Sequence, residues 1–240
     1  MLHFTSDLDP SIRLAFTSQH EGNLALHVND DPHHVAENRS RLEDSIGVRR
    51  FSLNFMNQVH SAAVFTVRPV ERNSWLDPQA PTCDGLVDPS GTQALAVMVA
   101  DCLPVLFVGR DNTEQRTVTA ATHAGRRGLL DGILTRTVEE LRALGAQDIE
   151  AIIGPSICGA CYEVSPEMAE ESEHIRSGIR SETRWGTTGL NLPASAEQEL
   201  AGLAVAVRQS GVCTLEDENY YSYRRSSDAG RLAGLIWSVA

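Results

Sequence analysis

The 240-residue chain contains no lysine, and all 20 of its permanently basic side chains are arginines. Reactions that need a lysine amine, such as Schiff-base formation with a carbonyl substrate, are therefore excluded. Acidic side chains number 32, which gives a formal net charge of −12. Because nucleic acids and anionic membranes recruit clustered positive charge, the sequence predicts neither as a partner.

Signals for export, membrane insertion or disulfide formation are also missing. Residues 1–7 contain neither the basic stretch nor the apolar core of a signal peptide. No apolar run approaches the roughly 20 residues that a membrane-spanning helix needs. Five cysteines, an odd number, do not indicate a disulfide framework in a chain of this length. We therefore expect a cytoplasmic protein with reduced thiols.

Composition and periodicity predict a folded protein with one large domain, over residues 1–240. Apolar residues make up 42% of the chain and charged residues 22%. Apolar and β-branched patterns predict strands at residues 51–55, 94–99, 105–108, 117–122, 149–153, 220–223 and 232–237. Helical spacing predicts helices at residues 130–144 and 194–209. This mixture, which lacks any glycine-rich phosphate-binding motif, indicates an α+β fold with mixed sheets.

Three residues with metal-binding side chains, His60, Cys102 and His123, each follow or end a predicted strand. Two imidazoles and a thiolate supply three zinc donors, and a catalytic zinc site typically has three protein ligands and one open position. The three lie far apart in sequence, and no paired C-x-x-C motifs or H-E-x-x-H helix force them together. The alternative is a buried cysteine and two hydrogen-bonded histidines.

Two acidic residues near these positions have more than one interpretation. Asp101 beside Cys102 is a candidate to orient a histidine ligand, provided that the chain bulges there. Pro104 favours such a break, because it has no N–H for the ladder. Asp84 before Gly85 is most simply a turn former, with a carboxylate facing the pocket as the alternative.

A basic pair and a cysteine pair are further candidates. Arg127 follows His123 on a glycine-flanked turn, ahead of a helix expected to begin near residue 129. Its guanidinium and the free N–H groups of a helix start predict a phosphate contact, with a solvated arginine as the alternative. We assign no role to Arg126. Cys158 and Cys161 form a C-x-x-C pair, for which packing near the metal pocket is favoured over redox chemistry.

The sequence motifs in these segments resemble those of one protein family. The sequences Ala-Asp-Cys-Leu-Pro at residues 100–104 and His-Ala-Gly-x-Arg-Gly at residues 123–128 resemble the proteins once called multicopper polyphenol oxidases, or laccase-domain proteins. The resemblance extends from about residue 20 to Trp237 and includes residues 24–27, 38–39, 58–60, 84–87, 153–155, 161–164 and 221–225. The chain departs from the family's usual pattern at three positions: Arg126 replaces a tryptophan, Ala160 a cysteine, and Cys158 a glycine.

The resemblance implies a four-layer α/β/β/α sandwich and a zinc-dependent enzyme that acts on purine nucleosides. Its implied reactions are phosphorolysis of adenosine, inosine and methylthioadenosine to the base and ribose 1-phosphate, and deamination of adenosine. Zinc would be held by His60, Cys102 and His123, with Asp101 and Arg127 as catalytic residues. The expected partners are nucleosides and phosphate, and the oligomeric state is left open, with a homo-oligomer as one alternative.

Two other enzyme classes compete with this interpretation. A Cys-His hydrolase would use Cys102 as the nucleophile and His123 or His60 as its base, without a metal. A copper-dependent polyphenol oxidase would need many histidines, typically in His-x-His pairs. The chain has only eight histidines and no such pair, so copper is disfavoured relative to zinc.

Overall fold

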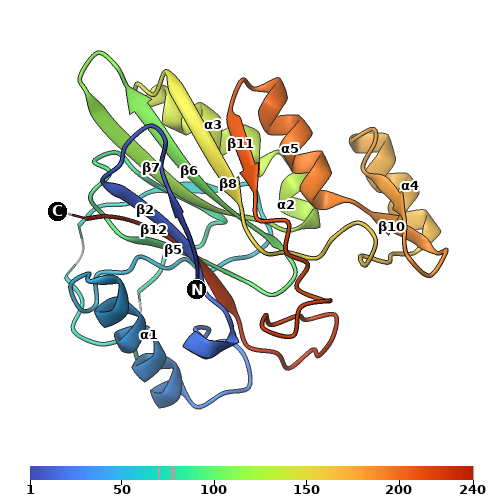
Figure 1. Cartoon of the computed structure of the whole chain (residues 1–240), viewed down its shortest axis with the longest axis horizontal. Coiled ribbons are helices and arrows are strands. Elements are labelled where there is room, and N and C mark those ends of the chain that lie inside the picture. The colour runs from blue at the N-terminus through green and yellow to red at the C-terminus, as the bar shows by residue number, and fades with distance from the viewer. Residues whose placement is uncertain (70, 77–78, 240) are drawn as a thin grey trace.

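Two stacked sheets form the centre of the molecule (Figure 1). The computed structural model describes residues 1–69, 71–76 and 79–239. The larger sheet has the order β11-β8-β6-β7-β4-β3 and comprises β3 Val64–Thr66, β4 Gly85–Asp88, β6 Leu103–Asp111, β7 Arg116–Ala124, β8 Asp148–Ile153 and β11 Ala206–Gln209. The smaller has the order β1-β2-β12-β5 and comprises β1 Leu2–Thr5, β2 Ile12–Phe16, β5 Leu95–Val99 and β12 Leu232–Ser238.

Helices cover the outer faces of both sheets (Figure 1). They are α1 Pro32–Ile46, α2 Arg126–Leu130, α3 Ile133–Ala143, α4 Pro166–Ile175 and α5 Leu192–Gly202. A short hairpin, β9 Arg180–Glu182 and β10 Thr188–Leu190, lies beside α4. None of the helices in the described ranges is long and apolar enough to cross a membrane.

Three buried apolar clusters separate four layers. The first packs the larger sheet against α3 and α5, through residues such as Phe107 and Leu134. The second lies between the sheets and includes Leu14 and Leu106. The third packs the smaller sheet against α1. The larger sheet is mixed, because β3 runs parallel to β4, and β11 to β8, while its other pairs are antiparallel. The predicted α+β fold in four layers is confirmed.

Several predicted elements are found close to their expected bounds, and two are not strands. Residues 51–55 form no strand, because the N–H groups of Phe51, Ser52 and Leu53 donate to the buried carboxylate of Glu43 instead of to a neighbouring strand. Residues 220–223 lie in a turn-rich loop. Helix α1 was not expected from the sequence, although Asp31 caps its first turn.

The helix predicted at residues 194–209 is wrong in its second half. Helix α5 ends at Gly202, and Ala204 adopts a left-handed backbone with φ 55°. The chain then reverses into β11, which pairs in parallel with β8. The spacing of apolar residues at 203–207 is compatible with both a helix and an edge strand. Pairing with β8 therefore determines that these residues lead into a strand.

Candidate metal centre

The three predicted metal ligands converge at one end of the sheets. His60 lies in the loop before β3, Cys102 in the link between β5 and β6, and His123 near the end of β7. Their ligand atoms all lie within 4.8 Å of one another. Nε2 of His60 is 3.8 Å from Sγ of Cys102, and the two imidazole centroids are 4.7 Å apart with the rings at 78°.

Cys102 lies where the chain crosses from one sheet to the other. Strand β5 belongs to the smaller sheet and β6 to the larger, and only residues 100–102 connect them. Asp101 in this link has a left-handed backbone with φ 84°. The expected break at Pro104 is wrong: Pro104 lies inside β6 opposite His123, whose N–H donates to the Asp84 carbonyl at 2.7 Å. Cys102 therefore immediately precedes the first strand residue.

A single buried carboxylate, that of Asp84, connects the side chain of His123 to the backbone of the loop that carries His60. It accepts a hydrogen bond from Nδ1 of His123 at 2.8 Å. It also accepts the N–H groups of Val59, His60 and Ser61 at 3.2, 3.0 and 2.7 Å, and the Ser61 hydroxyl at 2.8 Å. Asp84 is fully buried. These contacts hold His60 in its left-handed backbone conformation of φ 58° and fix the orientation of the His123 ring.

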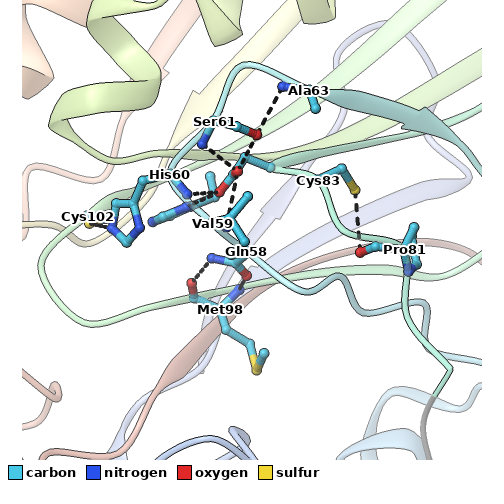
Figure 2. A network of polar contacts seen from close by, with 11 residues as sticks. Gln58, Val59, His60, Ser61, Ala63, Pro81, Cys83, Met98 and Cys102 are labelled. Atoms are coloured by element: carbon cyan, nitrogen blue, oxygen red, sulfur yellow. Dashed lines mark hydrogen bonds and ion pairs between the residues drawn. The ribbon is translucent and has the colours of Figure 1, made fainter.

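Gln58 attaches the same loop to the smaller sheet. Its side-chain amide donates to the Met98 carbonyl at 2.7 Å, and its oxygen accepts the Met98 N–H at 2.8 Å. Figure 2 shows this pair of bonds, with Gln58 and His60 in one loop and Cys102 facing His60. Hydrogen bonds thus attach the loop to β5 through Gln58 and to the Asp84 carboxylate through its backbone N–H groups. Together these two attachments fix the position of His60.

Two glycines allow the turn after β7 to approach the site. A Cβ at Gly125 would lie 2.6 Å from Cδ2 of His60 and 3.2 Å from Sγ of Cys102. A Cβ at Gly128 would lie 2.8 Å from the Ser61 carbonyl oxygen. Any side chain at Gly125 would therefore collide with two of the candidate ligands.

The charges of Cys102 and His123 are strongly coupled. Burial by itself would raise the pKa of Cys102, but the neighbouring His123 and His60 lower it to about 6. Burial would lower the pKa of His123, but Cys102 and the hydrogen bond to Asp84 raise it to about 9. Burial also opposes ionisation of Asp84, yet its bonds from His123 and Ser61 lower its pKa to about 2. Without a metal, the site favours a thiolate beside an imidazolium at neutral pH.

A cavity of about 700 Å³ opens beside two of the three side chains, those of His60 and Cys102. Its lining includes His60, Cys102, Tyr162 and the three arginines Arg126, Arg127 and Arg224. The Arg224 guanidinium donates to the Glu163 carbonyl at 2.9 Å and lies over the Tyr162 ring. The arginines give this cavity a local positive charge within a protein of net charge −12.

The two arginines of the turn differ in their contacts. Nη1 of Arg126 lies 3.5 Å from the Ser172 hydroxyl. Arg127 is exposed, and no acidic side chain in the described ranges forms an ion pair with it. Helix α2 begins at Arg126, earlier than predicted, and has only five residues. Such a short helix adds little to anion binding, so the guanidinium itself is the relevant group.

The structure places Asp101 differently from the prediction. Its carboxylate accepts the Thr214 hydroxyl at 2.7 Å and the Arg224 N–H at 2.7 Å, and no described histidine donates to it. Asp84 orients the histidine instead. Through these hydrogen bonds, Asp101 connects the segment at residues 100–102, which contains Cys102, to the loop that contains Arg224.

The cysteine pair belongs to a second group of side chains. Cys158 and Cys161 lie with Cys213 and Glu216, and the four ligand atoms are within 4.8 Å of one another. Burial raises the pKa of Cys158, and raises that of Cys161 to about 12. These values disfavour a reactive redox thiolate. Both cysteines are separate from the three-residue centre, although the adjacent Tyr162 lines its cavity.

Comparison with known proteins identifies the family. A family model described as multi-copper polyphenol oxidoreductase laccase matches residues 14–239, and the chain belongs to this family. A protein of Streptomyces coelicolor named purine nucleoside phosphorylase is 41% identical over 90% of this chain and 88% of its own length. One of Corynebacterium glutamicum with the same name is 39% identical over 96% of this chain and 97% of its own length. These relatives support an enzyme.

Solved structures show the same fold. The Neisseria meningitidis protein NMB0706, of the DUF152 family, is 29% identical, with a TM-score of 0.80 over 100% of both chains. The YfiH protein of Bacillus licheniformis is 25% identical, with a TM-score of 0.82 over 95% of this chain and 93% of its own.

Proposed function

We propose that the protein is a zinc-dependent purine nucleoside phosphorylase that also deaminates adenosine. The observation that carries the proposal is the convergence of His60, Cys102 and His123 beside an arginine-lined cavity. The name shared by the relatives supports the substrate class. The expected substrates are adenosine, inosine and methylthioadenosine, with phosphate as the second substrate.

The donor set fits a zinc ion with an open position. One thiolate and two imidazoles are three of the four ligands that zinc prefers. Because Nδ1–H of His123 donates to Asp84, Nε2 is the ring nitrogen left to bind the metal, which would displace the proton that Nε2 carries in the metal-free imidazolium. Zinc with an open position lowers the pKa of a bound water to about 7 and polarises substrate oxygens. Copper chemistry of the laccase type is disfavoured, because only two histidines of the described residues reach the centre.

The remaining residues of the cavity suit the substrates. A volume of about 700 Å³ lies within the roughly 300–1,000 Å³ range of small-molecule sites. A nucleoside is uncharged, so the net charge of −12 does not repel it. Phosphate needs local cations, and Arg127, which has no acidic partner among the described residues, offers two parallel donors. We assign Asp101 a positioning role, through its bonds to Thr214 and the Arg224 backbone.

A nucleoside panel with matched metal variants tests the proposal. Zinc-loaded protein should convert adenosine and phosphate to adenine and ribose 1-phosphate, and adenosine without phosphate to inosine. Cys102→Ala and His123→Ala should each lose both reactions and one metal ion per chain, whereas Cys83→Ala, at a buried thiol outside the centre, should keep them. Failure of zinc-loaded protein to form either product would refute the nucleoside assignment.

The Cys-His hydrolase is the second candidate function. It is favoured by the lowered pKa of Cys102, about 6, beside a His123 whose pKa is raised to about 9. Metal removal separates the two functions. Hydrolysis that persists in chelator and stops on alkylation of Cys102 would establish the hydrolase, whereas loss of activity in chelator and recovery with zinc would exclude it.

A further inference from the structure

A second cluster of metal-binding side chains lies outside the centre described above. It consists of Cys158, Cys161, Cys213 and Glu216, whose ligand atoms all lie within 4.8 Å of one another. Sγ of Cys158 is 3.7 Å from Oε2 of Glu216. Around a tetrahedral zinc, a thiolate sulfur and a carboxylate oxygen would be about 3.5 Å apart, given bond lengths of about 2.3 and 2.0 Å. The four side chains are therefore already spaced for one ion.

Two turns of the same geometry present these four residues. In the first, the N–H groups of Cys161 and Tyr162 both donate to the Cys158 carbonyl at 3.0 Å. In the second, those of Glu216 and Asp217 donate to the Cys213 carbonyl at 3.2 and 3.0 Å. The sequence thus contains a C-x-x-C and a C-x-x-E, each with its two candidate ligands on a single turn. This spacing is typical of structural zinc sites built from two short knuckles.

The two turns are held side by side. Ser156 and Cys213 form a parallel bridge, in which the Ser156 N–H donates to the Val212 carbonyl at 3.2 Å and the Thr214 N–H to the Ser156 carbonyl at 3.1 Å. The Cys158 N–H points at Sγ of Cys213 at 3.4 Å. Backbone N–H groups aimed at sulfur stabilise a thiolate, as a bound metal requires.

Charge and burial also suit a metal. Cys161 and Cys213 are buried, while Glu216 is exposed and forms an ion pair with Arg184 through its other oxygen. A divalent ion would neutralise half of the charge of three thiolates and one carboxylate, and Arg184 would neutralise part of the rest. Thiolate-rich sets select zinc over hard cations such as magnesium. Four protein ligands leave no position open, which is the mark of a structural ion.

We propose that Cys158, Cys161, Cys213 and Glu216 bind a second zinc ion, which has a structural role. The ion would clamp the segment at residues 157–163 to the segment at residues 213–217. The first carries Tyr162 and Glu163 to the wall of the cavity, and Thr214 in the second donates to Asp101 beside Cys102. The structural zinc would therefore brace one side of the cavity without contacting substrate. This proposal does not depend on the proposed function of the first centre.

Metal content of matched variants separates the two sites. If both centres hold zinc, wild-type protein should carry two zinc ions per chain, Cys102→Ala and Cys161→Ser one each, and the double variant none. If only the second centre does, wild type and Cys102→Ala should each carry one and Cys161→Ser none. Cys83→Ser, at another buried thiol, should keep both. Glu216→Gln should weaken the second zinc alone, and because Glu216 is exposed the variant should fold normally. The proposal is overturned if Cys161→Ser retains all of the wild-type metal, or if Cys102→Ala is metal-free.

Two measurements on intact protein remain decisive if a cysteine variant fails to fold. Alkylation followed by mass spectrometry should find Cys158, Cys161 and Cys213 protected in the zinc-loaded protein and modified after chelation. Cobalt in Cys102→Ala protein should give sulfur-to-cobalt charge-transfer absorption, because three thiolates remain to bind it. A Cys158–Cys161 disulfide in freshly purified protein, or equal labelling with and without zinc, would refute the site.

Discussion

At the scale of single residues, Asp84 organises the candidate centre without reaching the metal position. Its two oxygens accept five hydrogen bonds, from His123, from Ser61 twice, and from the N–H groups of Val59 and His60. Removing its charge would leave His123 free to rotate and would release the loop that carries His60. Outer partners of this kind fix the ring orientation and the basicity of a ligating histidine, and so contribute to metal affinity.

We expect Asp84→Asn to lower zinc affinity and nucleoside cleavage by about 10–100-fold, the usual cost of losing such a partner. The amide can accept fewer of the five bonds and carries no charge to balance an imidazole bound to zinc. Asp88→Asn is the matched control, because Asp88 is also buried, ends the strand that Asp84 immediately precedes, and among the described residues bonds only to the turn at Ser90 and Gln93. Titration of zinc into each metal-free protein measures the effect, and equal affinities for the two variants would contradict it.

The second prediction for a single residue concerns phosphate binding by Arg127. If it holds phosphate, Arg127→Ala should reduce phosphorolysis by about ten- to a hundredfold, since a charge-assisted contact contributes roughly 1.5–3 kcal/mol. Deamination, which uses no phosphate, should change much less. Arg126→Ala is the control on the same turn and should have a smaller effect. The KM for phosphate is the direct measurement, and equal loss of both activities with zinc retained would show that Arg127 does not bind phosphate.

Sequence motifs predict ligands better than they predict the residues that support them. The candidates His60, Cys102 and His123 were selected by their family-like segments, because by residue type alone a buried cysteine and hydrogen-bonded histidines are the commoner interpretation. Asp84 was ambiguous, because Asp followed by Gly is also a common turn. Its role depends on β4 lying beside β7, a pairing across more than thirty residues of chain that no local pattern encodes.

At the scale of elements, the close packing of the turn after β7 against the loop before β3 defines the centre. Gly125→Ala should disrupt it, because the new Cβ would lie 2.6 Å from His60 and 3.2 Å from Cys102. We expect loss of bound metal and of activity, with the secondary structure and the four layers retained. Gly202→Ala, where a Cβ meets no atom within 4 Å, should behave as wild type. Circular dichroism with zinc analysis tests both, and unchanged zinc binding by Gly125→Ala would contradict the packing argument.

The prediction of secondary-structure elements succeeded where the sequence contains a short apolar run of strand length that is also buried in the fold. Residues 94–99 and 105–108 are apolar runs, and residues 149–153 are apolar apart from Glu150. All three are buried on both faces and are strands. It failed where a side chain competes for the backbone, as Glu43 does for residues 51–53. It also failed at residues 203–209, where an edge strand follows a helix without a change in composition.

At the scale of the whole molecule, the centre exists because two sheets meet there. Residues 100–102 pass from β5 in one sheet to β6 in the other, and the loop before β3 is attached to both β5 and the Asp84 carboxylate. The four-layer order follows from family resemblance, since strand patterns alone do not specify which sheet each strand joins. The same hydrogen bonds of Asp84 that hold the loop before β3 against the sheet also orient His123. The free energy of unfolding and the geometry of the centre therefore both depend on Asp84.

This coupling predicts how the stability of metal-free protein depends on pH. The pKa of Asp84 falls from 3.8 to about 2 on folding, so the unfolded chain binds its proton more readily than the folded one. The stabilising contribution is therefore fully present above pH 3.8 and lost as the pH falls through about 2. The difference between the two pKa values corresponds to about 2 kcal/mol at neutral pH.

Urea unfolding in chelator, from about pH 5 to about pH 3, isolates this contribution. Over that range Cys102, with a pKa of about 6, and His123, with a pKa of about 9, are already protonated in the folded protein. The free energy of unfolding of the wild type should exceed that of Asp84→Asn by the most at pH 5, and the gap should narrow as the pH falls. Asp88→Asn serves as the reference for loss of a buried carboxylate at the other end of β4. A gap that stays constant across this range would mean that the Asp84 charge contributes nothing to stability, and that its hydrogen bonds act only on the geometry of the centre.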